Sequence, residues 1–352
     1  MICAGGTGGH IFPGIAVAEA FLARDDKNEV VFVGTTGGLE GAIIPKAGFR
    51  LLYIKAHQFL GRSPLYKVLA IVGLLQGIAM SVAVLRGERP HFILGMGGFT
   101  CVPVIIAGVL MRIPCFLHEQ NVEPGLANKF LSRITKKTFI SFDETQRYLD
   151  PNKVSLSGNP LRRELTKDHA EKNKGTFGIF VFGGSRGARS VNDAILTLLP
   201  YLESYKNMVM YHQTGREDFD RVNDAYRDTP VAHEVFPFTD EMEKYYRLSD
   251  IIISRAGATT IFELAYFRKA AVLIPYPYSA GNHQWKNASY VESMGGAHVV
   301  ADVEATGERL FEIIAHLMKE PELLDEMGQN MGKIYVDDAA SRIVGGIEHG
   351  LS

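Results

Sequence analysis

The chain has 352 residues, a formal net charge of −2, 46% hydrophobic residues and 22% charged residues. This length exceeds the usual size of one hydrophobic core, so we expect two domains, and the balanced charge argues against a nucleic-acid-binding protein. Cysteines occur at positions 3, 101 and 115 without a CxxC or Cys/His pattern, which indicates buried cytosolic thiols rather than disulfides or metal ligands.

The residues that precede the first glycine, Met1 to Ala4, are too few for the apolar region of a signal peptide. They are also few for a β-strand, so the chain begins with at most a stub of one. Two explanations stay open: a sheet edge that tolerates a short strand, or a native start that lies upstream.

The first motif is the glycine-rich stretch at residues 5–10, Gly-Gly-Thr-Gly-Gly-His, and Pro13 just beyond it suits the first turn of a helix. Glycines permit positive φ and a close approach to a ligand. A turn that opens a helix directs N–H groups and the positive end of the helix dipole to one point, which favours phosphate. Two hypotheses follow: a phosphate-facing loop with His10 as a general base, or a tight turn beside a half-buried histidine. The spacing matches neither GxGxxG nor GxxxxGK[ST], so the motif alone does not decide.

Short apolar runs that alternate with helical segments predict parallel βαβ units in the first half of the chain. The predicted strands are 30–34, 49–54, 91–94, 114–117 and 138–141, the last taken as the final strand of this half. Ligands bind at the carboxyl ends of such strands. The polar or glycine-rich turns 5–10, 95–98 and 118–121 all fall at that rim.

The longest apolar run extends from Leu65 to Leu85 and is interrupted by Lys67, Gln76 and Ser81. Its uninterrupted part is shorter than the ~20 residues that a membrane-spanning helix needs. Two interpretations remain: one or two buried helices, or a partly exposed face on a membrane. In the second case, basic residues could meet anionic head groups; they are Arg62, Lys67, Arg86 and Arg89.

Residues 150–162 and the polar stretch 167–175 predict a linker, after which the pattern of the first half restarts. Strands are predicted at 177–182, 208–211, 251–254 and 272–275, a glycine turn at 183–189, and helix from 309 onward. Two similar α/β halves of this kind would form a cleft with a phosphate-binding loop on each wall.

The most distinctive segment of the second half is 254–263, where a strand ends, a glycine turn follows and a helix starts at Ala258. The N–H groups of that helix start favour a diphosphate. Glu263 lies one turn further and can accept two hydrogen bonds from a ribose diol. The alternative is an ordinary carboxylate near a helix N-terminus.

Together these segments resemble the MurG family, glycosyltransferases that add N-acetylglucosamine to lipid I to make lipid II. The matching segments are GGTGGH at 5–10, GMGGF at 95–99, HEQN at 118–121, GNPLR at 158–162, GGSRGAR at 183–189, SRAGATTIFE at 254–263 and His283-Gln284. They span nearly the whole chain in the family's order, and as a set they are highly specific.

The resemblance implies an α/β fold of the GT-B type, with two Rossmann-like, doubly wound parallel-sheet domains that face each other across a cleft. Residues 1–157 would form an acceptor-binding and membrane-facing domain, with a C-terminal helix at about 337–352 packed back on it. Residues 158–336 would form the UDP-sugar-binding domain.

The resemblance also implies roles for residues at matching positions. His10 would be the catalytic base, and Gly97 and Gly98 would meet the acceptor pyrophosphate. Residues implied in donor binding are Thr7, Gly8, Gly9, Asn121, Arg162, Ser185, Thr239, Ala258, Thr259, Thr260, Glu263 and Gln284. Leu65, Tyr66 and Leu69 would belong to the membrane face.

The implied reaction inverts the anomeric carbon and needs no metal or other cofactor, because helix N-termini and Arg162 can stabilise the departing UDP. The implied partners are UDP-N-acetylglucosamine, lipid I, the anionic inner-leaflet surface and other cell-wall synthesis proteins. The location would be peripheral, on the cytoplasmic face of the bacterial plasma membrane. Alternatives are transfer to another lipid such as diacylglycerol, a UDP-N-acetylglucosamine 2-epimerase, and a catalytically silent nucleotide-sugar-binding subunit.

Overall fold

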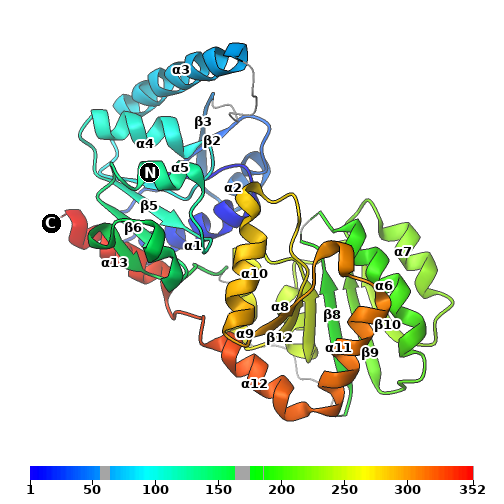
Figure 1. Cartoon of the computed structure of the whole chain (residues 1–352). Helices are drawn as coiled ribbons and strands as arrows, with labels where there is room; N and C mark the ends of the chain where they lie inside the picture. Colours follow the sequence, from blue (N-terminus) through cyan, green and yellow to red (C-terminus); the bar gives the residue numbers. More distant parts are fainter. Residues whose placement is uncertain (56–63, 163–174, 185, 352) are drawn as a thin grey trace. The chain divides into compact units, whose positions relative to one another are not determined.

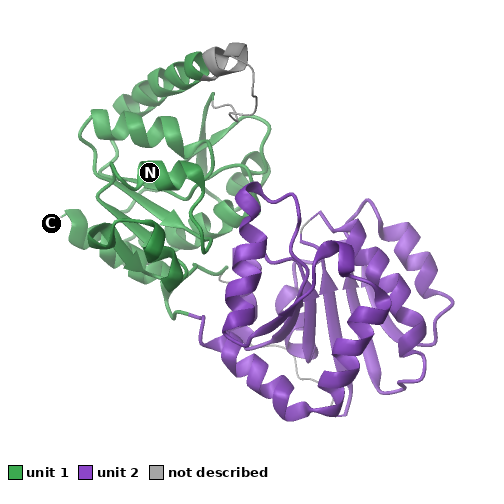
Figure 2. Cartoon of the chain, viewed as in Figure 1, with its two compact units in different colours: residues 1–162, 336–352 green, residues 163–335 purple. Residues whose placement is uncertain are grey.

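The computed structural model describes residues 1–55, 64–162, 175–184 and 186–351, with the side chains of 64–70 left out. Two compact units divide the chain (Figure 2): unit 1 comprises Met1–Arg162 and Val336–Ser352, and unit 2 comprises Arg163–Tyr335. The division therefore falls at 162/163, rather than at the boundary of 157/158 that the sequence indicated.

Unit 1 contains a parallel sheet of seven strands in the order β3-β2-β1-β4-β5-β6-β7. The strands are β1 (Ile2–Cys3), β2 (Val31–Thr35), β3 (Arg50–Ile54), β4 (Ile93–Gly95), β5 (Cys115–Glu119), β6 (Lys137–Ile140) and β7 (Val154–Leu156). The helices are α1 (Gly8–Arg24), α2 (Glu40–Lys46), α3 (Pro64–Glu88), α4 (Cys101–Leu110), α5 (Leu126–Leu131) and α13 (Ala339–Leu351). Short 3₁₀ turns lie at Asp143–Tyr148 and Pro151–Lys153.

Successive residues of the unit 1 strands bury side chains on opposite faces of the sheet, as strand geometry requires. On β1, Ile2 packs with α1, α2 and α13, whereas Cys3 packs with α3, α4 and α5. Figure 1 shows these helices on the two faces. Both faces are covered, which is why these strands are continuously apolar rather than alternating.

Two expectations for unit 1 were wrong, and one of the two explanations for the short first strand does not apply. The short strand β1 lies in the centre of the sheet, hydrogen-bonded to β2 and β4, and not at an edge. Strand β6 is not the last strand of this unit, because β7 pairs with it. Strand β7 lies in the segment that was predicted to be a linker. Pro13 lies inside α1 and not in its first turn, because the helix already starts at Gly8.

Unit 2 contains a parallel sheet of six strands in the order β10-β9-β8-β11-β12-β13. The strands are β8 (Phe177–Phe182), β9 (Met208–Gln213), β10 (Ala232–Phe236), β11 (Ile251–Ser254), β12 (Ala270–Leu273) and β13 (Ala297–Val299). The helices are α6 (Arg189–Leu202), α7 (Phe219–Tyr226), α8 (Met242–Leu248), α9 (Ala258–Phe267), α10 (His283–Ser293), α11 (Gly307–Lys319) and α12 (Pro321–Gly332), with 3₁₀ turns at Ala280–Asn282 and Asp302–Glu304. Strands β10 and β13 were missed from the sequence.

One face of the unit 2 sheet packs aliphatic residues against α6, α7, α11 and α12. The other face carries aromatic rings: Phe180 lies 4.9 Å from Phe182 and 5.7 Å from Tyr246, measured between ring centroids. The two doubly wound parallel sheets confirm the predicted fold class.

The long apolar run forms one helix, α3, with two different sides. Gly77, Ser81 and Leu85 are buried one turn apart, and a Cβ on Gly77 would lie 3.2 Å from Pro103 of α4. On another side Ile71 and Leu75 are 59% and 60% exposed. The window Ile71–Glu88 is long and apolar enough to cross a membrane, judged by length and composition, and 17% of it is buried.

Candidate functional site

In each unit the turns singled out from the sequence follow the carboxyl ends of adjacent parallel strands. In unit 1 the central strands β1, β4 and β5 lead into residues 4–7, 96–100 and 120–125. In unit 2 the strands β9, β8 and β11 lead into 214–218, 183–188 and 255–257. Parallel strands bring all their carboxyl ends to one edge, so each sheet has its own candidate site there.

His10 lies in the first turn of α1, behind Gly8 and Gly9, with the exposed Thr7 as the residue that precedes the helix. Its Nδ1 atom lies 3.1 Å from Oε1 of Gln120, which follows β5. The turn after β4 makes room for the ring: a Cβ on Gly97 would lie only 2.9 Å from His10 Cε1.

Gly97 and Gly98 both have positive φ, at +102° and +82°, so the turn that faces His10 needs glycine for its conformation as well as for space. The structure thus brings His10, Gly97 and Gly98 together, although His10 and Gly97 are 87 positions apart in the sequence.

The side chain of Gln120 connects His10 to a second, fully buried histidine. Its Nε2 donates to Met96 O at 2.7 Å and to His118 Nδ1 at 3.0 Å. His118 Nε2 lies 3.1 Å from Gly158 O. Burial lowers the pKa of His118 to about 4, although the contact with Gly158 O opposes this, so His118 is neutral near pH 7.

Asn121 follows Gln120 directly in the sequence. Its backbone N–H and side-chain amide both donate to Oε1 of Glu119, at 2.9 and 3.1 Å. Asn128 donates to the other carboxylate oxygen at 2.8 Å. Burial raises the pKa of Glu119 although these donors oppose it.

Arg162 lies near the turn that contains His10. Its guanidinium lies 4.7 Å from the ring centroid of Phe12 on α1.

Glu40 is a residue of this edge that the sequence reasoning missed. Its carboxylate is fully buried and accepts hydrogen bonds from the N–H of Gly6 at 3.1 Å and from the N–H and hydroxyl of Thr35 at 2.9 and 2.7 Å. Burial opposes its ionisation, but these donors prevail and the pKa of Glu40 lies below its ordinary value. A Cβ on Gly34 or Gly38 would clash with this side chain. The glycines near Glu40 in the sequence were therefore the only local indication that its side chain is buried there.

In unit 2 the glycine turn after β8 is packed directly against the turn after β9. A Cβ on Gly187 would lie 2.1 Å from Thr214 O, and one on Gly215 would lie 2.3 Å from Arg186 O. Both glycines have positive φ, at +78° and +82°. Ser185, predicted in donor binding, lies outside the described residues.

Gln213, at the end of β9, bridges the glycine turn after β8 and the segment that contains Thr239. Its Nε2 donates to Gly184 O at 3.3 Å in the glycine turn, and its Oε1 accepts from the N–H of Thr239 at 3.2 Å. The side chain is 3% exposed. No local pattern marked this residue, because both of its partners lie on other loops.

The segment that starts α9 takes the form that the sequence indicated. Gly257 precedes the helix, and Ala258, Thr259 and Thr260 form its first turn. Glu263 lies one turn further with 4% exposure, and its Oε2 accepts a 2.7 Å hydrogen bond from the hydroxyl of Tyr246 on α8.

Arg255 connects the turn after β11 to neighbouring segments, and the sequence analysis did not predict this role. Its guanidinium pairs with Asp302 and donates to Ser190 Oγ at 2.8 Å and to Ile274 O at 3.1 Å. Gln284, in the first turn of α10, accepts from the N–H of Tyr276 at 2.9 Å. The turns after β11 and β12 are therefore tied together at one edge.

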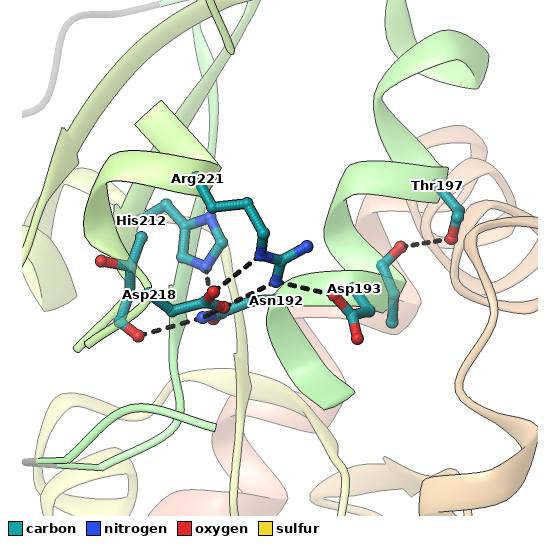
Figure 3. Close-up of polar contacts among 8 residues, drawn as sticks. Asn192, Asp193, Thr197, His212, Asp218 and Arg221 are labelled. Carbon is teal, nitrogen blue, oxygen red and sulfur yellow. Dashed lines mark hydrogen bonds and ion pairs between the residues drawn. The ribbon is translucent and has the colours of Figure 1, made fainter. Parts of the chain in front are cut away.

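A polar network supports the turn after β9 from the side of α6 and α7 (Figure 3). His212 lies 3.1 Å from Asn192 Oδ1, while Asn192 Nδ2 donates to Thr214 O at 3.0 Å and to Asp218 at 2.7 Å. Arg221 forms two hydrogen bonds with Asp218. Burial lowers the pKa of His212 to about 3, so this histidine is a neutral structural group.

The same network involves an Asp-x-Asp sequence, Asp218-Phe219-Asp220, a pattern that metal-dependent nucleotide-sugar enzymes commonly use as ligands. Here Asp218 is an ion-pair partner of Arg221. Within the described ranges, no group of three or more His, Cys, Asp and Glu side chains could hold a metal ion. The side chains of Leu65, Tyr66 and Leu69 lie outside the described residues, so their predicted membrane role has no structural description.

Comparison with protein families and curated sequences finds relatives that match both units. Residues 1–140 match the family model described as glycosyltransferase family 28 N-terminal domain, and residues 178–343 match the C-terminal domain of that family. A protein of Geotalea daltonii, 42% identical over 98% of this chain and 95% of its own, is named UDP-N-acetylglucosamine–N-acetylmuramyl-(pentapeptide) pyrophosphoryl-undecaprenol N-acetylglucosamine transferase. A Geobacter sulfurreducens protein with the same name is 40% identical over 98% of this chain and 96% of its own.

Among solved structures, the crystal structure of MurG from Acinetobacter baumannii is similar to this chain, with a TM-score of 0.81 and 27% identity over 99% of this chain and 98% of that one. A putative UDP-N-acetylglucosamine 2-epimerase of Listeria monocytogenes also superposes, with a TM-score of 0.73, but only 12% identity over 99% and 95% of the two chains. The second similarity shows a shared fold alone.

Proposed function

The chain belongs to glycosyltransferase family 28, and we propose on that premise that it transfers N-acetylglucosamine from UDP-N-acetylglucosamine to undecaprenyl-pyrophosphoryl-N-acetylmuramyl-pentapeptide, which is lipid I. The observation that carries this proposal is the common name of relatives about 40% identical over nearly the full chain. The product would be lipid II, the disaccharide precursor of peptidoglycan.

The carboxyl edge of unit 2 is the proposed donor site. The first turn of α9 directs N–H groups to one point and suits a diphosphate, and Glu263 behind it suits the ribose hydroxyls. Thr239, tied to the glycine turn through Gln213, suits the nucleobase end. Gln284 is proposed to contact the sugar hydroxyls.

The carboxyl edge of unit 1 supplies the proposed base. In a single displacement the acceptor hydroxyl oxygen attacks the anomeric carbon, the bond from that carbon to UDP breaks, and UDP leaves with the electron pair. The hydroxyl proton goes to His10, and the anomeric configuration inverts. A neutral histidine is suited to this role near pH 7. Gly97 and Gly98 beside it are the proposed contact for the acceptor pyrophosphate.

Backbone N–H groups at helix starts can stabilise the charge that develops on UDP, so we propose that the reaction needs no metal. Donor contacts from Thr7, Gly8, Gly9, Asn121, Arg162 and Ser185 stay predictions.

A lipid-linked acceptor requires the enzyme to reach a membrane, and we propose that α3 and α5 of unit 1 lie on its cytoplasmic surface. Apolar side chains on both helices are exposed, with Leu126 at 88% and Phe130 at 52% on α5 in addition to Ile71 and Leu75 on α3. Both helices contact α4, which lies between them in the sequence (Figure 1). Exposed basic residues near these helices suit anionic head groups; they are Arg86, Arg89, Arg112 and Arg133.

The experiment that tests the proposed function measures transfer of labelled sugar from UDP-N-acetylglucosamine to a lipid I analogue in EDTA, with wild type and His10→Ala. We expect transfer by the wild type and a kcat at least roughly 100-fold lower in the variant. A nearly normal variant would remove His10 from the chemistry. Wild-type epimerisation of the free UDP-sugar without transfer would overturn the transferase assignment, and a preference for diacylglycerol would replace the acceptor.

A further inference from the structure

The orientation of the Gln120 side-chain amide is determined by its neighbours. Met96 O is a carbonyl oxygen and can only accept, so the amide atom 2.7 Å away must be the nitrogen Nε2. The other amide atom, which faces His10 Nδ1 at 3.1 Å, is then the oxygen Oε1. An amide oxygen can only accept, so Nδ1 of His10 must carry a proton.

We propose that Gln120 is a positioning residue that holds His10 in the Nδ1–H tautomer and thereby places the lone pair of the neutral imidazole on Nε2. This inference rests on the proposed role of His10 as the base, and it specifies which nitrogen of His10 takes the proton from the acceptor hydroxyl. A neutral histidine has one donor and one acceptor nitrogen, so the assignment of Nδ1 decides the state of Nε2.

The hydrogen-bond chain beyond Gln120 agrees with this orientation at each step. The second proton on Nε2 of Gln120 points to His118 Nδ1 at 3.0 Å, so Nδ1 of His118 must be an acceptor. The remaining nitrogen of His118 then carries the proton and donates to Gly158 O at 3.1 Å. His118 is fully buried and neutral, so the chain runs in one direction from His10 to a backbone carbonyl of the same unit.

The surroundings also restrict the ring of His10 to this position. The Gly97 backbone lies so close that a Cβ there would be 2.9 Å from Cε1 and 3.1 Å from Nδ1. Gln120 itself is 2% exposed and is held by its two donor bonds. A base that must meet a hydroxyl group within hydrogen-bond distance gains from such a restriction, because catalysis depends on alignment.

Two substitutions separate this role from simple packing. Methionine has nearly the size and shape of glutamine but provides no strong acceptor for Nδ1–H. Glutamate provides an acceptor whether or not it is protonated, because a carboxylic acid can donate to Met96 O and still accept from His10. If Gln120 only fills space, Gln120→Met should resemble wild type and Gln120→Glu should be the more damaging. The tautomer role predicts the opposite order.

The first readout is the tautomer itself, measured by ¹⁵N NMR on the full chain with labelled histidine. The His10→Gln variant identifies the His10 signals. We expect the Nδ1–H form in wild type and in Gln120→Glu, and a mixture of tautomers in Gln120→Met. An Nε2–H form in wild type would overturn the inference whatever the enzyme's activity.

The second readout is steady-state transfer from UDP-N-acetylglucosamine to the lipid I analogue. We expect Gln120→Met to lower kcat by roughly 10- to 100-fold while KM for the donor stays within about twofold, and Gln120→Glu to recover most of that loss. Gln146→Met, at an exposed glutamine of the same unit, is the matched control. Equal kcat for Gln120→Met and wild type would overturn the inference. Absence of transfer by the wild type would reject the proposed function while leaving the NMR result to decide the tautomer.

Discussion

The hydroxyl group of Tyr246 donates a 2.7 Å hydrogen bond to Oε2 of Glu263, and the two side chains are 0% and 4% exposed. The tyrosine belongs to α8 and the glutamate to α9, so the bond fixes the carboxylate from outside its own helix. A ribose-binding carboxylate benefits from this arrangement, because one oxygen is held and the group has a single orientation.

Tyr246→Phe should therefore weaken donor binding without changing the fold, since the ring stays and only the hydroxyl is lost. Loss of one hydrogen bond to a charged group is worth roughly 1.5–3 kcal/mol, which predicts a Kd for UDP at least ~10-fold higher by calorimetry. The preference for UDP over its 2′-deoxyribose analogue should also shrink.

The control for this substitution is Tyr245→Phe, which removes the hydroxyl bonded to Glu234 at 2.6 Å. We expect this neighbour to leave UDP binding unchanged. An equal loss in both variants would show that the effect comes from the aromatic cluster and not from Glu263.

Gln213→Met should disconnect the glycine turn from the segment that contains Thr239. Two partly buried hydrogen bonds are lost, each worth about 1 kcal/mol, so the Kd for UDP should rise by roughly 10- to 30-fold. The affinity for uridine alone should fall less, because uridine does not occupy the diphosphate part of the site. Gln329→Met, at an exposed glutamine on α12, is the control, and unchanged UDP affinity in Gln213→Met would contradict the proposed donor site.

His212 should make unit 2 less stable in acid. Its pKa is about 3 in the folded protein against an ordinary value of 6.5. Between these values the unfolded chain binds a proton that the folded chain does not, so stability rises with pH up to about 6.5 and is flat above it. The slope from one such group is at most about 1.4 kcal/mol per pH unit.

The measurement is the free energy of unfolding from urea titrations between pH 4.5 and 7.5. His212→Gln should flatten the lower part of this profile, whereas Tyr226→Phe, which removes only the hydroxyl near Nδ1, should keep its slope. The same slope in His212→Gln and wild type would assign the acid sensitivity to other groups.

The exposed apolar side chains of α3 should carry membrane binding. We expect the double variant Ile71→Gln and Leu75→Gln to reduce binding to anionic vesicles at least ~10-fold, since each buried aliphatic side chain contributes roughly 1.5–3 kcal/mol. Sedimentation with vesicles measures this, with activity on a water-soluble acceptor analogue expected to stay unchanged.

The matched control for the membrane face is Leu22→Gln on α1, where the leucine is 38% exposed on the opposite face of the sheet. Vesicle binding should be unaffected there. Equal binding by the α3 double variant and wild type would reject α3 as the membrane face.

The features that could be predicted from the amino-acid sequence are those that depend on neighbours along the chain. Apolar strand runs, glycine turns after them and the helix start at Ala258 were all readable, because strand burial, positive φ and N–H groups at a helix start are local properties. Segments with weaker local signals were misjudged: β7 was taken for a linker, and β10 and β13 were not predicted. These strands are short or partly exposed, so their apolar pattern is faint.

The polar side chains that orient the candidate site could not be predicted in this way, because their partners lie far away along the chain. Gln120 meets His10 across 110 positions, Glu40 meets Gly6 across 34, and Gln213 meets Thr239 across 26. None of these pairs leaves a periodic pattern in the sequence, because a hydrogen bond between two loops depends on strand order and not on spacing. The parallel sheets bring distant carboxyl ends to one edge, and there a single amide or carboxylate can align the residues of neighbouring turns.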